Sequence, residues 1–441
     1  MDRHVIANMG TELGATTTVF PSDDATRRFM AAYGREDQWV ELRADDDASY
    51  HATDEIDLSS LEPLIAKPSS PGNVVPVREV AGAPLYQAYI GSSANPGYRD
   101  FAMPARMVEG RAVASGVSFD LNPSSRSMLQ DLIREGMLTH LLQAGGRLHQ
   151  AGCNGCIGMG QAPATDGNSL RTVPRNFPGR SGTKEDRVFL CSPETATASA
   201  LRGEITDPRD LDMAYPEVAE PRERAGWDDE LLVAPPPPEQ GRKVELKKGP
   251  NIVTLPELDP LPDTMELPVL LKVGDDISTD EIMPAGSEIL PYRSNVPKIA
   301  GYVFSQVDGS YPDRAEATRH DGGHAVVGGS NYGQGSSREH AAIAPRYLGL
   351  RMVLVKGFAR IHRQNLINFG VLPVTFRDGA DYDAIEQGDT LRVTGIRKAV
   401  TAGSALAVEN VTKGETYQVA APLSEREREV LLAGGVTSWM A

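Results

Sequence analysis

The 441-residue chain has only three cysteines, and aromatic residues make up 6% of it. So few cysteines, in an odd number, exclude a disulfide-stabilised fold and are typical of proteins in a reducing compartment. No apolar run approaches the ~18 to 20 residues that a membrane-spanning helix needs, and the opening MDRHVIANMG lacks the features of a secretory signal. We therefore expect a globular cytoplasmic protein that does not enter a membrane.

Basic residues are scarce relative to acidic ones. The chain has 44 lysines and arginines against 60 aspartates and glutamates, which gives a formal net charge of −16. Because no basic block or basic amphipathic helix offsets this charge, it opposes binding to nucleic acid or to an anionic membrane. An anionic ligand would have to be attracted by a few local arginines.

The length suggests about two to four domains. Residues 234–257, APPPPEQGRKVELKKGPNIVTLPE, combine a proline run with charged residues and little apolar periodicity, which is typical of an interdomain linker. Before it, apolar residues over 125–142 recur on one helical face. Gly145 and Gly146 are expected to end that helix and to leave the cysteines on the following loop.

After the linker, the sequence alternates between two kinds of element. Strands are predicted at 325–327, 352–355 and 371–376, with helices over 336–349 and 361–369. Strand, helix and strand in this order imply parallel pairing through right-handed crossovers. The predicted fold class is therefore α/β.

The stretch AGCNGCIGMG at 151–160 holds two of the three cysteines as a C-x-x-C pair. A zinc ribbon needs a second pair, and His149 could complete at most three ligands. A thioredoxin-like redox pair begins a helix after a strand, whereas this pair follows a predicted helix. An iron–sulfur cluster usually takes three or four thiolates. The third cysteine, Cys191, ends the strand-like run VFLC and is more simply explained as a core residue.

Two other segments are suited to anion binding. GGSNYGQGSSREH at 328–340 places glycines and serines between a strand and a helix, where free N–H groups attract carboxylate or phosphate, although an ordinary turn with a serine N-cap explains it equally well. RTVPRNFPGRSG at 171–182 concentrates three arginines among fixed turns. That pattern suits a polycarboxylate, but it also occurs in solvated loops.

Six segments occur in a fixed order along the chain: NMGTELGATTTVFPSD (8–23), IGSSANPGYRD (90–100), GCNGCIG (152–158), RNFPGR (175–180), DDISTDEIMPAG (275–286) and GSSREHAA (335–342). In their order and content they resemble the aconitase family over nearly the whole chain. The resemblance implies an aconitate hydratase-like hydro-lyase that interconverts citrate and isocitrate through cis-aconitate. It also implies a [4Fe–4S] cluster, in which one iron without a cysteine ligand acts as a Lewis acid on the tricarboxylate.

The resemblance assigns roles to individual residues. Cys153 and Cys156 correspond to two of the three cluster cysteines, and Ser336 corresponds to the serine base that removes the Cα proton. An alkoxide needs stabilisation, which the N-terminus of the predicted helix, backbone amides and Arg338 would supply. The other matches are the carboxylate-binding turn at Ser337 and Arg338, the substrate-binding Arg175, Arg180 and, with different spacing, Arg293, the acidic Asp280, and Asn8 and Glu12 near the cluster.

The chain departs from the family pattern at Ser93. The family commonly has its third cluster cysteine here, and serine offers a hard, weakly acidic hydroxyl instead. Four interpretations stay open: ligation by the serine oxygen, a cluster held by two cysteines and another group, recruitment of Cys191, or no cluster. We favour a bound cluster with altered ligation. Pro174 also stands where the family often has asparagine, which removes one side-chain hydrogen bond.

A further departure concerns the start of the chain. It opens at a motif well inside the family's cluster-binding region, so the resemblance implies that the family's N-terminal domain is absent. With it go an Asp-His pair and a glutamine that contact substrate and protonate the leaving hydroxyl. His4 and His149 are more simply surface residues than substitutes for these groups. We expect either a separate polypeptide that completes the site or a truncated chain with little activity.

The expected organisation has four parts. They are the end of one α/β domain at 1–55, a cluster-binding α/β domain at 56–215, a linker at 216–265 and a swivelling α/β domain at 266–441, with the active site between the two domains. The expected ligand is a small tricarboxylate. The alternatives are a related hydro-lyase that acts on homoaconitate or methylcitrate, and a non-enzymatic remnant.

Overall fold

The computed structural model describes residues 2–10, 12, 14–15, 17–221, 231–286, 288–336 and 338–441, without the side chains of Asp2 and Asn154. The chain divides into two compact units. The N-terminal unit comprises Met1–Gly10 and Thr17–Val244, and the C-terminal unit comprises Thr11–Thr16 and Glu245–Ala441. Both units mix helices with sheets, which confirms the α/β class, while the four-part division stays a prediction. Within the described residues no helix is long and apolar enough to cross a membrane.

A seven-stranded sheet forms the centre of the N-terminal unit, in the order β2-β1-β7-β6-β3-β4-β5. Its strands are β1 (Leu64–Ala66), β2 (Val74–Pro76), β3 (Gln87–Gly91), β4 (Ser118–Asn122), β5 (Gly146–Leu148), β6 (Asn168–Arg171) and β7 (Arg187–Leu190). β3 to β7 pair in parallel, and β1 is antiparallel to both of its neighbours. After β3 the chain adds β4 and β5 on one side and β6 and β7 on the other. The carboxyl ends of β3 and β6 therefore form the topological switch point, where α/β sheets bind ligands.

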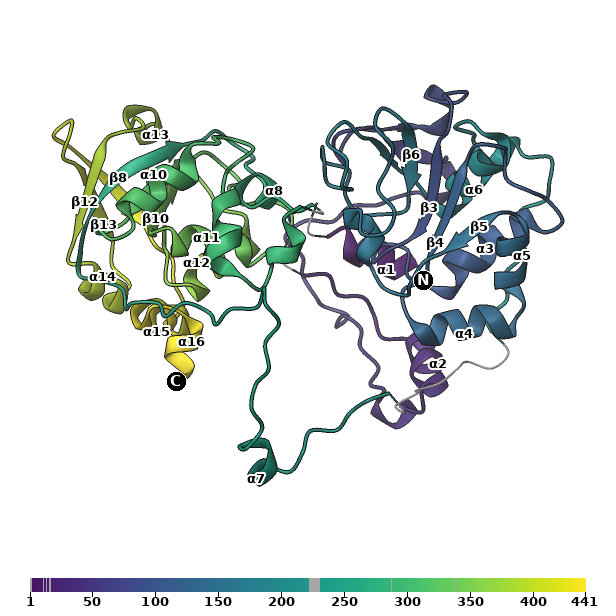
Figure 1. The fold of residues 1–441 in the computed structure, drawn as a ribbon, viewed down its shortest axis with the longest axis horizontal. Coiled ribbons are helices and arrows are strands. Elements are labelled where there is room, and N and C mark those ends of the chain that lie inside the picture. The colour runs from purple at the N-terminus through teal and green to yellow at the C-terminus, as the bar shows by residue number, and fades with distance from the viewer. Residues whose placement is uncertain are drawn as a thin grey trace. The chain divides into compact units, whose positions relative to one another are not determined.

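The two faces of this sheet differ in chemistry. Four helices, α3 (Tyr98–Val108), α4 (Arg126–Arg134), α5 (Met137–Gln143) and α6 (Pro193–Arg202), bury an apolar core against one face (Figure 1). Alternate strand residues point to the opposite face, and there they are polar. The buried members of this polar face are Gln87, Tyr89, Asp120, Asn122, Ser169 and Arg171. The loop that carries the cysteines contacts this face through Gly155 and Gln161.

The single helix predicted over 125–142 is wrong in detail. The chain forms α4 and α5, separated at Gly136, whose φ of 74° lies in the left-handed region. The three-residue strand β5 then pairs in parallel with β4 before the cysteines are reached. So short a strand has too little periodicity to be recognised from sequence. Preceding this sheet are α1 (Asp2–Asn8) and α2 (Asp24–Ala32), and α2 buries none of its residues.

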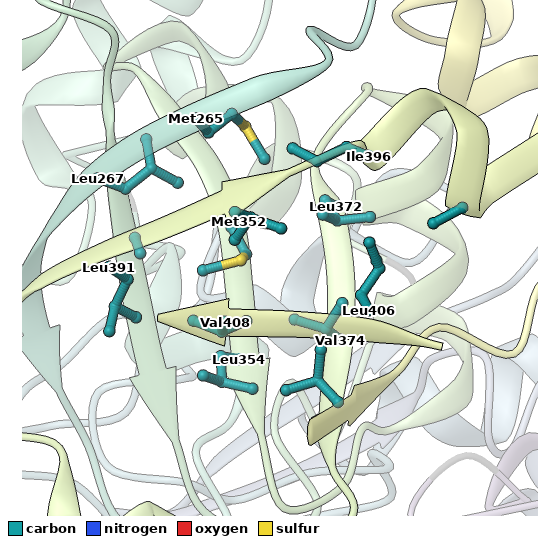
Figure 2. Packing of buried hydrophobic residues seen from close by; sticks show 14 of the residues in the cluster. Met265, Leu267, Met352, Leu354, Leu372, Val374, Leu391, Ile396, Leu406 and Val408 are labelled. Carbon is teal, nitrogen blue, oxygen red and sulfur yellow. The ribbon is translucent and has the colours of Figure 1, made fainter. Parts of the chain in front are cut away.

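The C-terminal unit is a closed barrel in the order β10-β11-β14-β13-β12-β8-β9. Its strands are β8 (Thr264–Lys272), β9 (His324–Gly328), β10 (Leu350–Val355), β11 (Leu372–Phe376), β12 (Thr390–Thr394), β13 (Leu406–Asn410) and β14 (Glu415–Ala420). β8 to β11 pair in parallel and the remaining pairs are antiparallel. Apolar side chains such as Leu267, Met352 and Leu391 fill one core of this unit (Figure 2).

Helices surround this barrel. They are α8 (Thr279–Ile282), α9 (Val296–Ile299), α10 (Tyr311–Thr318), α11 (His340–Tyr347), α12 (Arg360–Asn368), α13 (Asp381–Ala384), α14 (Ile396–Ala402), α15 (Glu425–Ala433) and α16 (Val436–Met440), while α7 (Pro238–Gly241) lies in the proline-rich segment before the barrel. The predicted parallel strands are confirmed at β9, β10 and β11, and the second predicted helix at α12. The first predicted helix begins at His340, not at Ser336, and its N-cap is Glu339.

Candidate functional site

Ser93 lies at the switch point of the N-terminal sheet, two residues beyond the end of β3. The adjoining backbone is tied to the segment after β6, because Gly91 N donates to Thr172 Oγ1 and Thr172 Oγ1 donates to Gly91 O, both over 2.9 Å. Ser92 Oγ also donates to Thr172 O over 2.7 Å. Three hydrogen bonds across two strands therefore fix the position of Ser93.

The two cysteines of the C-x-x-C pair converge with Ser93. Cys153 is exposed and Cys156 is buried on a short 3₁₀ turn, Asn154–Ile157, and their Sγ atoms lie 3.7 Å apart. The hydrogen bond with the Cys156 thiol lowers the pKa of Cys153 to about 6, helped by hydrogen bonds from Ser93 and by the charge of Arg180. The same contact, together with burial, raises the pKa of Cys156. Cys153 is therefore the more acidic thiol of the pair.

The loop between β6 and β7 (residues 172–186), which carries Arg175 and Arg180, packs against the turn that carries the cysteines. Ser181 Oγ donates to Cys156 O over 3.5 Å, and a Cβ on Gly158 would lie 2.2 Å from Ser181 O, so the two loops meet without a gap. Arg180 is buried, and its charge and that of Arg175 act on the Cys156 thiol. The structure thus brings both predicted arginines to the thiol pair.

Cys191 and His149 have other surroundings. Cys191 packs against the apolar core on the helix-covered face, where burial raises its thiol pKa. His149, which was expected to be a simple surface residue, is bound through Nε2 to the fully buried Asp120 over 2.9 Å. That expectation is wrong, because the polar face of β4 provides a partner that the sequence did not reveal.

An iron–sulfur group would meet an incomplete thiolate set in this unit. Among the described residues, no three His, Cys, Asp or Glu side chains gather as metal ligands. The third donor that the chain does place beside Cys153 is Ser93, whose side chain and backbone both hydrogen-bond to that sulfur. The donors that the chain places together for such a group are therefore two sulfurs and one hydroxyl oxygen.

Ser336 lies in the C-terminal unit, on the loop that follows β9. Its hydroxyl is 3.3 Å from the Thr279 hydroxyl, and its N–H donates to the same Thr279 oxygen over 3.1 Å. The loop after β8 and the loop after β9 are joined by backbone bonds, including Thr279 N to Gln334 O over 2.8 Å and Gly333 N to Ile277 O over 2.7 Å. The serine is therefore held by the first residue of α8, and it is not the helix cap that the sequence predicted.

Arg338 connects the loop between β9 and α11 (residues 329–339), here called the serine loop, to α8. Its Nη2 forms an ion pair with Asp280 Oδ1 over 2.7 Å, and both side chains are largely buried. Nη1 donates to the carbonyls of Met283 and Thr279. The start of α8 is in turn fixed by a capping box between Ser278 and Glu281. Two predicted site residues, Arg338 and Asp280, thus form one buried pair.

Gly333 is a point of close approach in the loop that carries Ser336. Its φ is +83°, and a Cβ there would lie 2.3 Å from the ring of His362 on α12. Tyr332, the preceding residue, is buried and bonds through its backbone to Gly357 and Ala359. Contacts with α12 and with the turn before α12 therefore hold the loop in place.

None of the contacts described above joins the other predicted residues, Arg293, Asn8 and Glu12, to Ser336. Arg293 is exposed, and its carbonyl accepts from His340 Nε2 over 2.7 Å. Asn8 ends α1 in the N-terminal unit, and Glu12, half buried, belongs to the C-terminal unit. Ser337 lies outside the described residues.

Sequence reasoning missed Thr279 and the polar network beneath the cysteine turn. A signal for the network was present, because Gln87 and Tyr89, Asp120 and Asn122, and Ser169 and Arg171 are each two residues apart within short apolar strands. In a parallel sheet that is buried on both faces, such a period of two in polar residues indicates a polar face.

The fold and these sites define an α/β protein that carries a thiol site on a seven-stranded sheet and a serine site on a barrel. The family model "Aconitase family (aconitate hydratase)" matches residues 1–85 and 78–203, and the model "Aconitase C-terminal domain" matches residues 293–379. The chain belongs to the aconitase family.

Curated relatives extend these matches. "Aconitate hydratase, mitochondrial" from Gracilaria gracilis is 34% identical over 468 residues, which cover 93% of this chain and 60% of the relative. "Homocitrate dehydratase, mitochondrial" from Saccharomyces cerevisiae is 30% identical over 99% of this chain and 64% of its own length. "3-isopropylmalate dehydratase large subunit 2" from Archaeoglobus fulgidus is 40% identical over 48% of this chain and 51% of its own length.

Two facts follow from these relatives. The chain spans about 60% of the length of the aconitate hydratases that it matches. Those from Gracilaria gracilis, Candida albicans and Saccharomyces cerevisiae are named mitochondrial, which overturns the expectation of a cytoplasmic protein. That expectation rested on the lack of a secretory signal, which does not distinguish the cytoplasm from an organelle.

Proposed function

We propose that this chain carries the hydro-lyase chemistry of its family, removing water from a hydroxy-tricarboxylate and adding it back, with citrate and isocitrate as the substrates. The observation that carries the proposal is that the family's motif residues gather in two groups, one in each unit. Ser93, Cys153, Cys156 and the two arginines meet at the switch point, and Ser336 is held against Thr279 beside the Arg338–Asp280 pair.

Ser336 is the proposed base for the Cα proton. Its hydroxyl becomes a base only where the alkoxide form is stabilised, and Thr279 can supply that stabilisation. Thr279 Oγ1 accepts the Ser336 N–H, so its own proton is available to the Ser336 oxygen 3.3 Å away. Arg338, paired with Asp280, donates to the Thr279 carbonyl and so helps to hold Thr279 in place.

Arg175 and Arg180 are the proposed partners for substrate carboxylates. They provide the local positive charge that a polyanion needs in a chain of net charge −16. Cys153, Cys156 and Ser93 would hold the iron–sulfur group, which supplies Lewis-acid chemistry at the substrate hydroxyl when bound. The serine ligand makes that group more labile than one held by three thiolates.

Citrate is preferred over related substrates because the aconitate hydratase from Gracilaria gracilis is 34% identical to this chain, compared with 30% for the homocitrate dehydratase. The homocitrate dehydratase match over 99% of the chain supports a second candidate, the dehydration of homocitrate. One relative is named a large subunit, so the assays are run with the chain alone and with candidate small subunits added.

The test is an anaerobic assay of cis-aconitate hydration after iron–sulfur reconstitution, with homocitrate in parallel. Iron and sulfide analysis with EPR shows whether the group is bound. Ser336→Ala is expected to abolish turnover and to leave substrate binding within about two-fold, because the hydroxyl acts on the proton and not on the carboxylates. Ser330→Ala, on the exposed part of the same loop, is the matched control. Turnover of Ser336→Ala close to that of the wild type refutes the assignment of the base.

A further inference from the structure

Arg171, at the end of β6, is a fully buried arginine that the proposed chemistry does not use. Its Nη1 donates to Gly155 O over 3.0 Å and its Nη2 to Gln161 O over 2.7 Å. Both carbonyls belong to the loop that carries the cysteines. Burial lowers the pKa of Arg171 only to about 10, so the guanidinium stays charged at neutral pH.

The peptide unit of Gly155 lies between the two cysteines and is held from both sides. Gly155 N donates to Asn122 Oδ1 over 3.3 Å, while its carbonyl accepts from Arg171. Asn122 is oriented by the Tyr89 hydroxyl over 2.6 Å, and burial raises the pKa of Tyr89 so that it stays a donor. A Cβ on residue 155 would lie 2.2 Å from that hydroxyl, so only glycine allows this close approach.

The remaining donors of Arg171 anchor it to the sheet. Nε donates to Ser169 Oγ over 3.0 Å and Nη2 to Gln87 Oε1 over 2.7 Å. Gln87 Nε2 in turn donates to the buried Asp120 over 3.0 Å, so one amide connects the buried cation to a buried carboxylate. Such a satisfied network is rigid, because removing one member leaves the others buried without partners.

We propose that Arg171 is the positioning residue of the thiol pair: with Asn122 it fixes the Gly155 peptide and thereby sets the separation of Cys153 and Cys156. The proposed function gives this pair its role as a ligand of the iron–sulfur group. The positioning itself is measurable on the metal-free chain, in the absence of turnover.

The experiment measures binding of phenylarsine oxide to the reduced, metal-free full chain. The reagent forms two As–S bonds with two adjacent thiols and releases one water, so its affinity reports the geometry of the pair. Arg171→Gln is expected to weaken binding about 10-fold or more, because the second As–S bond loses its high effective concentration. Arg147→Gln is the control, because Arg147 is exposed and its Nη1 donates to the Gln161 side chain rather than to the backbone of the cysteine loop; this variant is expected to bind as the wild type does.

Alkylation of Cys191 by iodoacetamide serves as an internal measure of folding, since Cys191 packs against the core. If Cys191 becomes exposed in Arg171→Gln, the variant is misfolded and Gly155→Ala is tested in its place. A methyl group at residue 155 clashes with the Tyr89 hydroxyl and so displaces the same peptide unit without removing Arg171. Weakened arsenical binding with Cys191 still protected supports the proposal. Binding within about two-fold of the wild type in a folded variant, or in Gly155→Ala, overturns it. Wild-type chain that binds the arsenical but hydrates no substrate refutes the proposed function and leaves the positioning role intact.

Discussion

The hydroxyl oxygens of Thr279 and Ser336 lie 3.3 Å apart, and the Ser336 N–H is bonded to the same threonine oxygen. Thr279 is therefore the side chain that decides whether Ser336 can act as a base. Thr279→Val keeps the shape of the residue and removes the hydroxyl. We expect kcat to fall about 100-fold, the usual effect of removing one donor to a developing oxyanion, with KM nearly unchanged.

Steady-state kinetics of cis-aconitate hydration check this prediction. Thr279→Ser is the control, because it restores the hydroxyl and should recover most of the lost rate. A valine variant with the kcat of the wild type would show that Thr279 has only a structural role.

Arg338 is expected to be intolerant of lysine. A lysine ammonium cannot reach Asp280 and the two carbonyls of Met283 and Thr279 at once, so one buried acceptor loses its partner. We expect Arg338→Lys to destabilise the C-terminal unit by about 2 to 3 kcal/mol, as is usual when a buried ion pair is impaired. Denaturant unfolding, followed by hydrogen exchange of α8 (Thr279–Ile282), checks this, and an unchanged midpoint contradicts it.

Asp186 gives the N-terminal unit a dependence on pH. Burial raises the pKa of its carboxyl from 3.8 to about 6, and Oδ2 is buried with no hydrogen-bond partner among the described residues. Between pH 3.8 and about pH 6, the folded state binds more protons at this carboxyl than the unfolded state does. The protonated carboxyl therefore contributes its full stability below the unfolded pKa of 3.8. That contribution is lost as the pH rises through the folded pKa of about 6.

Asp186→Asn should therefore raise stability at pH 7.5, by about 1 kcal/mol after allowance for solvent screening, and should change little at pH 4. Calorimetric melts at the two pH values measure the difference. An equal gain at both would mean that the effect does not come from the carboxyl charge.

Gly333→Ala tests the close approach of the loop that carries Ser336 to α12. The φ of +83° and the 2.3 Å approach to His362 both oppose a side chain, and we expect a loss of about 2 to 3 kcal/mol together with lower kcat. Gly274→Ala, in the loop after β8, is the control because a Cβ there meets nothing within 4 Å. Equal melting temperatures for the two variants would contradict the prediction.

Apolar periodicity and glycine punctuation placed β9, β10, β11 and α12, because those elements are long enough to show a period. The six motif segments were also sufficient to identify the family. Periodicity failed where backbone geometry overrides it: at Gly136, which divides one predicted helix into α4 and α5, and before His340, where bonds to Thr279 keep Ser336 out of α11.

The sequence by itself determined which chemical groups are available: two thiols, a hydroxyl at position 93, three arginines between positions 171 and 180 and a serine after a glycine-rich turn. Tertiary structure decided which of these groups meet. Parallel pairing of β3, β4 and β6 lines up Tyr89, Asn122 and Arg171, which lie far apart along the chain, on one buried face under Gly155. Such a network depends on strand order and register, which no local pattern encodes, because each polar residue is satisfied only by partners on other strands.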